Sequence, residues 1–321
     1  MLLFPSRFPN RTRIVTVPTL STRKTVARFT PLHAPAMKKI PWLVHGFSTR
    51  AGGFSTVYGS KTLNLGFTRD DSRQNVEKNR SKLLLSIGAS DERKPWPLQS
   101  LRQIHSDIIH VVRQAQAGPL TGDGLITNVP GIALAVMTAD CFPVLLADKK
   151  NKVVGAFHAG WRGTVGRIAE KGLGIMRREF GTQPEDVFAA IGPGIQQCCY
   201  EVGQELKDQF ESQFSYGSEL FREVKHYDAV HEKYPLLFMN MRAPGHGNQC
   251  IKLHLDLKEA NRRQLLEAGI PQKQISALAE CTSCDTRSFF SHRAEKGHTG
   301  RMMAVIGIKE PDQPCVVGVS G

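Results

Sequence analysis

Two histidines and one cysteine are the residues of this chain with the most distinctive chemistry. His105 lies in RQIHSD, Cys141 in TADC and His158 in AFHAGWRG, each at or near the end of an expected strand. Imidazole and thiolate are the usual ligands of zinc, and three protein ligands leave the fourth position open, as in catalytic sites. Such a site supplies hydroxide at neutral pH. No local HExxH or paired CxxC pattern joins the three residues, so a metal site is one hypothesis among several.

The same residues fit a second chemistry. Cys141 could act as a thiolate nucleophile with His105 or His158 as its base, and glycine-rich turns could donate N–H groups to an oxyanion. Asp140 would orient a histidine or an arginine in either case. The alternative for Asp140 is a cap on the turn at the strand end. An acid next to a core strand needs an explanation, because carboxylates are rarely buried without a partner.

Four further cysteines are predicted to be structural. Cys281 and Cys284 have CxxC spacing, but no second CxxC exists to complete a zinc site. Cys198 and Cys199 are adjacent, and two neighbouring side chains of a strand point to opposite faces. The sequence therefore predicts no shared metal for these residues.

Strand-like and helix-like segments alternate along the chain and must position the candidate residues. GIALAVMTAD precedes Cys141, FPVLLAD follows it, and the polar KKNK joins FPVLLAD to VVGAFHAG in an expected hairpin. Apolar periodicity and terminal caps predict helices over SRQNVEKNRSKLLLSIG, VGRIAEKGLGIMRREFG and DLKEANRRQLLEAGI. SLRQIHSDIIHVV is expected to be one strand, or two, carrying His105. No repeat or linker divides the body, which favours one α/β-type domain.

The net charge of +13 is concentrated at the N-terminal end. Residues 1–69 contain 11 Lys or Arg and no Asp or Glu, so the rest of the chain has a net charge of only +2. This distribution argues against a basic face for nucleic acid. We expect residues 1–36 to be a basic extension and residues 37–321 to be the catalytic domain. The extension could be an ordinary or partly ordered tail, a disordered tail, an organellar transit peptide, or a segment before a translation start at Met37.

The chain is expected to be cytoplasmic, with organellar targeting by the extension left open. No apolar stretch reaches the ~18 residues of a membrane span, so no membrane association is expected. Pro5 interrupts MLLFPSRF, which is too short for a signal peptide. The seven cysteines are an odd number, which favours reduced thiols.

Eight motifs occur in order between about Trp42 and Ile308: HGFSTRAGG, LNLGF, QIHSD, GDGLIT, TADCFPVLL, HAGWRG, IGPGIQQCCYEVG and FFSHR…TGR. Together they resemble the multicopper polyphenol oxidoreductase (laccase-domain) family. The family includes purine nucleoside phosphorylases, adenosine deaminases and bacterial proteins described as peptidoglycan editing factors.

The resemblance implies a fold, a metal and an activity. The fold would be a single α/β (α+β) domain with mixed sheets in four layers, helix–sheet–sheet–helix. The metal would be zinc held by His105, Cys141 and His158; copper is less favoured because no further histidine-rich segment could complete a multicopper cluster. The partners would be inorganic phosphate and purine nucleosides, with phosphorolysis of adenosine, inosine, guanosine or 5′-methylthioadenosine and deamination of adenosine.

Four side chains are candidates for substrate binding under this resemblance. Arg50 in FSTR and Arg162 in GWRG could bind phosphate, because guanidinium pairs with it bidentately. Asn64 in NLG and Gln103 in RQIH could bind the ribose or the base edges. A structural hydrogen bond or a surface charge is the alternative for each.

Two positions depart from the family pattern. Many members carry arginine immediately before TADC, where this chain has Met137, and His292 stands in FFSHR where tyrosine is expected. No role of the family's arginine therefore carries over to Met137, and the resemblance does not define the pocket wall around His292. Alternative functions are a cysteine-type amidohydrolase acting on peptidoglycan precursors, a copper oxidase of phenols, and a non-catalytic nucleotide-binding module. The sequence does not set the oligomeric state.

Overall fold

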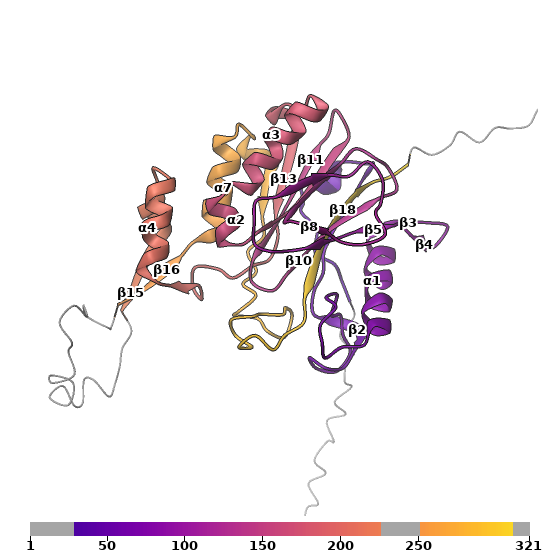
Figure 1. Ribbon diagram of the computed structural model, residues 1–321, viewed down its shortest axis with the longest axis horizontal. Coiled ribbons are helices and arrows are strands. Elements are labelled where there is room, and N and C mark those ends of the chain that lie inside the picture. The colour runs from indigo at the N-terminus through magenta and orange to yellow at the C-terminus, as the bar shows by residue number, and fades with distance from the viewer. Residues whose placement is uncertain (1–28, 226–250, 311–321) are drawn as a thin grey trace, which may run out of the picture.

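The computed structural model describes residues 29–225 and 251–310, whose core consists of two stacked sheets (Figure 1). The four-stranded sheet has the order β1 (Leu43–Phe47), β18 (Met302–Ile308), β10 (Ala133–Thr138) and β5 (Leu98–Gln99). The six-stranded sheet has the order β17 (Ile275–Ala277), β13 (Val187–Ile191), β11 (Phe142–Asp148), β12 (Val153–Ala159), β9 (Gly124–Thr127) and β7 (Ile109–Val111). Both sheets are mixed: β5 pairs with β10, β17 with β13 and β7 with β9 in parallel, and the other pairs are antiparallel.

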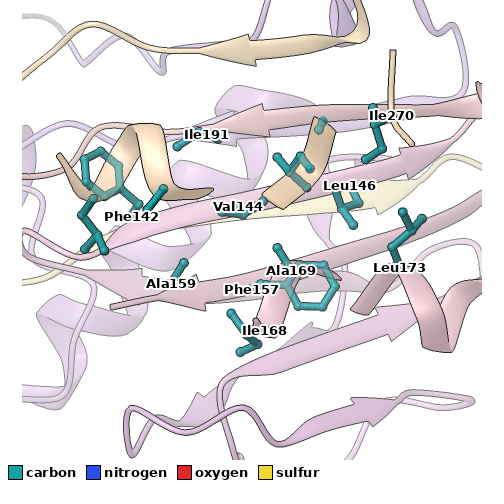
Figure 2. Packing of buried hydrophobic residues seen from close by; sticks show 14 of the residues in the cluster. Phe142, Val144, Leu146, Phe157, Ala159, Ile168, Ala169, Leu173, Ile191 and Ile270 are labelled. Carbon is teal, nitrogen blue, oxygen red and sulfur yellow. The ribbon is translucent and has the colours of Figure 1, made fainter. Parts of the chain in front are cut away.

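Helices cover the outer faces of both sheets, which confirms the predicted helix–sheet–sheet–helix arrangement. Helix α1 (Arg73–Ile87) packs on the four-stranded sheet, and α3 (Ile168–Phe180) and α7 (Leu257–Glu267) pack on the six-stranded sheet (Figure 1). Phe142, Val144 and Phe157 of the larger sheet pack in one apolar cluster with Ile168 and Leu173 of α3 (Figure 2). A separate apolar cluster, which includes Phe47, Leu134, Leu145, Ala156 and Ile306, fills the space between the sheets.

Local capping signals account for the helix ends. The Ser72 side chain accepts a hydrogen bond from the Asn75 N–H at 3.2 Å at the start of α1, and Asp256 accepts one from the Glu259 N–H at 2.9 Å at the start of α7. Gly88 and Gly181 end α1 and α3 with positive φ angles of 78° and 71°. These caps are the ones predicted, because they depend on residues close in sequence.

The predicted hairpin forms between β11 and β12. Its register pairs Phe142 with Ala159 and Pro143 with His158. At the other end, the buried carboxylate of Asp148 accepts hydrogen bonds from the N–H groups of Lys150 and Asn151 at 2.9 Å. The pairing therefore places Cys141, which directly precedes β11, beside the end of β12.

The remaining elements are short. A third sheet has the order β14 (Glu201–Val202), β16 (Ile251–Leu255) and β15 (Phe221–Lys225), and it lies next to α4 (Gln204–Gln213) in Figure 1. Helix α2 (Trp161–Val165) precedes α3. The other strands are β2 (Ala51–Ser55), β3 (Ser90–Asp91), β4 (Lys94–Pro95), β6 (Leu101–Arg102) and β8 (Leu120–Thr121), and 3-10 turns occupy Met37–Lys39, Pro184–Asp186, Gly217–Leu220 and Gln272–Gln274.

Two segments differ from the simplest sequence expectation. SLRQIHSDIIHVV forms β6 and β7, and His105 lies in the loop between them rather than in a strand. Residues 29–36, assigned to the extension, contact the body: Leu32 forms a bridge with Phe47, and Ala34 is fully buried. Residues 1–28 of the expected extension lie outside the described residues. None of the described helices is long and apolar enough to span a membrane.

Candidate functional site

The three residues proposed as metal ligands meet at one end of the β11–β12 hairpin. One ligand atom from each of His105, Cys141 and His158 lies within 4.8 Å of the others. The ring centroids of the two histidines are 4.9 Å apart. His158 is almost fully buried, Cys141 is half-buried and His105 is exposed. Two imidazoles and one thiolate at this spacing match the donor set of a zinc site with an open position.

The buried carboxylate of Asp123 holds this arrangement together. Its Oδ1 accepts hydrogen bonds from His158 Nδ1 at 2.8 Å and from the His105 N–H at 3.1 Å. Its Oδ2 accepts from the N–H and the hydroxyl of Ser106 at 2.7 and 2.8 Å, and from the Ile104 N–H at 3.2 Å. Because a carboxylate only accepts, Nδ1 of His158 carries the proton and Nε2 is left to bind a metal.

The charges in the site reinforce one another. Burial favours the neutral form of the Asp123 carboxyl, but hydrogen bonds from His158 and Ser106 outweigh it and lower its pKa to about 2. Burial likewise opposes ionisation of Cys141, yet the adjacent His158 and His105 lower its thiol pKa to about 6. Despite burial, Cys141 and Asp123 raise the pKa of His158 to about 9. Both shifts favour a thiolate–imidazolium pair over the neutral pair in the metal-free site, and a metal ion would replace the proton.

Gly160 leaves the space that the site needs. A Cβ atom at this position would lie 3.0 Å from Cys141 Sγ and 3.2 Å from His105 Cδ2. Its φ angle of −72° is one that any residue can adopt, so the requirement for glycine is purely steric.

A cavity of about 480 Å³ opens directly onto the three residues. This volume is typical of sites for small molecules. Its wall combines apolar surface with three arginines and a tyrosine, and burial raises the pKa of Tyr200 to about 12, so its phenol stays protonated at neutral pH. The lining residues besides the triad include Leu101, Arg102, Gln103, Met137, Ile195, Tyr200, His292, Arg293 and Arg301.

Of the four candidate substrate-binding residues, only Gln103 lines the cavity. Its amide is already engaged with Met137, donating to the carbonyl at 2.8 Å and accepting from the N–H at 2.7 Å. Arg162 is exposed, and its guanidinium lies over the Trp161 ring at 4.2 Å, outside the cavity lining.

Arg50 and Asn64 are occupied by structural hydrogen bonds away from the cavity. Arg50 donates to the Thr286 carbonyl at 2.8 Å and the Tyr58 carbonyl at 2.6 Å, and forms an ion pair with Glu295 at 2.7 Å. Asn64 is fully buried, and its Oδ1 accepts from the Arg301 N–H at 2.9 Å. Asn64 thus supports a residue of the cavity wall without lining the cavity itself.

Asp140 has partners other than a ligand histidine or an arginine side chain. Its Oδ1 accepts from the Thr282 hydroxyl and its Oδ2 from the Arg293 backbone N–H, both at 2.7 Å. Its backbone carbonyl accepts from the Ile195 N–H at 2.8 Å, and its φ of 91° is unusual for a non-glycine residue. Asp140 therefore binds the loops of Thr282 and Arg293 to the turn before Cys141. The carboxylate that accepts a hydrogen bond from a ligand histidine belongs to Asp123 instead.

Sequence reasoning missed Asp123 and the cavity arginines. Asp123 lies in the GDGLIT motif, where an acid between two glycines directly before an apolar strand was the available signal. Nothing local distinguishes Arg102, Arg293 and Arg301 from the other basic residues, since the fold alone brings them together. At the two family departures, Met137 and His292 both line the cavity, and Arg80 Nη2 lies 3.8 Å from Met137 Sδ.

Comparisons with known proteins agree on one family. The sequence model described as "Multi-copper polyphenol oxidoreductase laccase" matches residues 44–309. The purine nucleoside phosphorylase of Deinococcus radiodurans is 38% identical over 82% of this chain and 88% of its own length. The purine nucleoside phosphorylase YlmD of Geobacillus stearothermophilus is 34% identical over 84% of this chain and 95% of its own. Its crystal structure superimposes with a TM-score of 0.69, covering 88% of this chain and 97% of that one at 31% identity. Adenosine deaminase RL5, from an unknown prokaryotic organism, is 33% identical over 80% of this chain and 91% of its own length.

Asp123→Asn is expected to weaken metal binding by roughly 10- to 100-fold, because the ligand histidine loses its anionic partner. Competition with a chromophoric chelator measures the affinity. Asp148→Asn is the matched control: it also neutralises a fully buried aspartate that accepts backbone N–H groups, at the far end of β11. Equal affinities for Asp123→Asn and wild type would show that this carboxylate does not support the site.

Gly160→Ala is expected to lower metal affinity by roughly 10-fold or more, since displacements on the order of 0.5 Å already spoil a preorganised site. Gly174→Ala in α3 is the control, because a Cβ there meets nothing within 4 Å. Metal content after dialysis against limiting zinc measures the effect. Full occupancy in Gly160→Ala would contradict the steric argument.

Alkylation of Cys141 in metal-free protein is expected to have its midpoint near pH 6, because the thiol pKa is lowered to about 6. An unperturbed thiol would titrate near ~8.5. The rate is followed by iodoacetamide labelling and peptide mass mapping of the Cys141 peptide. His158→Asn removes the imidazolium and should move the midpoint upward; an unmoved midpoint would refute the pairing.

Proposed function

The chain belongs to the multicopper polyphenol oxidoreductase laccase family, and from this we propose that it is a zinc-dependent purine nucleoside phosphorylase that also deaminates adenosine. Its substrates would be adenosine, inosine, guanosine or 5′-methylthioadenosine, with inorganic phosphate. The names of its relatives, purine nucleoside phosphorylase and adenosine deaminase, support both reactions. The observation that carries the proposal is the His105–Cys141–His158 triad opening onto a cavity with three arginines.

The donor set fits a single zinc ion better than a copper cluster. Within residues 29–225 and 251–310, the triad is the only group of three or more potential ligands that contains histidine. A multicopper cluster would need several further histidines at this position. His105, Cys141 and His158 would hold the ion. With one position open, the ion would lower the pKa of bound water and so supply hydroxide, a nucleophile, at neutral pH. Oxidation of phenols is therefore disfavoured despite the family name.

The cavity wall suits a nucleoside and phosphate together. Arg102, Arg293 and Arg301 supply positive charge, and guanidinium groups bind phosphate oxygens through charge-assisted hydrogen bonds. Arg301 is held in place by hydrogen bonds of 3.0 Å to the Thr299 and Gly300 carbonyls. The protonated Tyr200 hydroxyl can donate a hydrogen bond to a base nitrogen or to the departing purine.

The two reactions use these groups differently. In phosphorolysis a phosphate oxygen attacks C1′ of the ribose, the C1′–N9 bond breaks, and the purine leaves with a proton. In deamination water adds at C6 of adenine and ammonia leaves. Phosphate and its arginines are needed only for the first reaction, which allows the two activities to be separated.

Metal-replete protein should release hypoxanthine from inosine only when phosphate is present, and should convert adenosine to inosine without phosphate. Liquid chromatography of the products measures both activities. Arg301→Gln is expected to raise KM for phosphate by about 10-fold or more and to leave deamination unchanged. Arg73→Gln, which removes an exposed charge on α1, is the control. Intact inosine after incubation with zinc and phosphate would refute the phosphorylase.

The paired thiolate and imidazolium favour one second candidate, a cysteine-type amidohydrolase acting on peptidoglycan precursors. Its hydrolysis would persist after chelation and stop on alkylation of Cys141. Loss of hydrolysis with zinc, restored by adding zinc back, would exclude it.

A further inference from the structure

Four cysteines outside the proposed active site converge at a second place in the fold. The Sγ atoms of Cys198, Cys199, Cys281 and Cys284 all lie within 4.8 Å of one another. The shortest separations are 3.3 Å between Cys199 and Cys284 and 3.5 Å between Cys198 and Cys284. Cys198 lies 3.7 Å from both Cys199 and Cys281. More than 80 residues of chain separate the two pairs, so the fold itself assembles the cluster.

These separations match the edges of a tetrahedral metal–thiolate site. Zn–S bonds of about 2.3 Å in a tetrahedron place the sulfurs about 3.8 Å apart. Four sulfurs between 3.3 and 4.8 Å apart therefore enclose the space of one ion. They are well beyond the ~2.05 Å of a disulfide bond.

The cluster has no evident role in core packing. Cys198 and Cys284 are exposed, and Cys199 and Cys281 are half-buried. Cysteine without a ligand is among the most buried residue types, so four at one surface position call for another explanation. The prediction that the four share no metal assumed that Cys198 and Cys199 lie in a strand. They lie instead in a turn, closed by hydrogen bonds from the Cys199 and Tyr200 N–H groups to the Gln196 carbonyl, and a turn allows neighbouring side chains to approach one point.

The backbone around the cluster is arranged as in metal–thiolate sites. The Gln196 N–H points at Cys281 Sγ from 3.4 Å, and the Gln196 side chain donates to the Glu280 carbonyl at 3.1 Å. The Thr282 N–H donates to the Gly194 carbonyl at 3.1 Å. These hydrogen bonds hold the turn with Cys198 and Cys199 against the turn with Cys281 and Cys284. An N–H group that points at sulfur also stabilises a thiolate ligand.

We propose that Cys198, Cys199, Cys281 and Cys284 bind a second metal ion, a zinc-class divalent cation in closed four-thiolate coordination. Its role is structural: it locks together the turns after β13 and β17. This site does not depend on the reaction assigned to the first site, because its ligands and its position are separate.

The second site is connected to the first through the chain. Asp140 lies next to Cys141. Its carboxylate accepts a hydrogen bond from the Thr282 hydroxyl at 2.7 Å, and its backbone carbonyl accepts one from the Ile195 N–H at 2.8 Å. Ile195 and Tyr200, which flank the first cysteine pair, both line the cavity. A metal ion in the second site would therefore hold one wall of the proposed active site in place.

Cobalt binding to the reduced full-length chain tests the proposal. Cys141→Ala removes the thiolate of the first site but should still bind Co²⁺ with strong sulfur-to-cobalt charge-transfer absorption and the intense visible bands of a tetrahedral ion. Cys198→Ser/Cys284→Ser should lose this signal and keep only the weaker one from Cys141. Elemental analysis should find about two zinc ions per wild-type chain and about one in each variant.

Cobalt binding to Cys141→Ala tests the proposal even if the Cys198→Ser/Cys284→Ser variant fails to fold, because Cys141→Ala keeps all four cysteines of the cluster. Reduced, metal-supplemented Cys141→Ala that shows no thiolate charge-transfer band would overturn the proposal. So would peptide mapping that finds a disulfide within the cluster together with no metal uptake after reduction, because the cysteines would then be a redox pair. Zinc uptake that raises the thermal midpoint of Cys141→Ala but leaves that of Cys198→Ser/Cys284→Ser/Cys141→Ala unchanged would support the structural role.

Discussion

Burial of the Asp123 carboxylate is the constraint on which the site depends. A carboxylate removed from water costs several kcal/mol unless hydrogen bonds replace its hydration. Asp123 obtains them from Ile104, His105 and Ser106 of one loop and from His158 of β12. These bonds join the loop to the sheet and set the orientation of one histidine and the position of the other. The positive φ of His105, 59°, is a local cost that this network offsets.

The position of the cysteine is set by the packing of the two sheets. The chain leaves the four-stranded sheet at Thr138 and enters the six-stranded sheet at Phe142, so only three residues make the crossing. Asp140 turns this corner with a φ of 91°, and its hydrogen bonds to Thr282 and Arg293 hold the strained backbone. Cys141 therefore faces His105 and His158 because of tertiary structure and not because of its neighbours in sequence.

The sequence predicts those parts of the structure that depend on local physics. The caps of α1 and α7 and the β11–β12 hairpin follow from residues within a few positions of one another. The residue types of the triad made a metal site one hypothesis among several, and the resemblance to the family singled it out. Side chains whose partners lie far away were not predictable: Arg50 bonds to Thr286 and Glu295, which are more than 230 residues distant.

The cysteine cluster is a second case in which contacts between residues distant in sequence could not be predicted. Spacing rules for metal sites assume that each pair of ligands has the backbone of a known motif. The turn at Cys198 and Cys199 does not follow that assumption. The parallel bridge between Gly194 and Cys281, with the hydrogen bonds of Gln196 to Glu280 and Cys281, brings the two pairs together. Likewise, the contact between Asp123 and His158 becomes visible only when β9 is placed beside β12.

The short crossing between the sheets links occupancy of the site to the cohesion of the domain. Cys141 belongs to the crossing, His158 to the larger sheet and His105 to the loop before β7, so an occupant that contacts all three restrains the crossing and this loop against the larger sheet. An occupant that binds only this folded arrangement adds its binding free energy to that of folding, and the gain grows with the logarithm of its concentration. A larger supply of the occupant would then raise the free energy of unfolding of the chain, independently of any turnover.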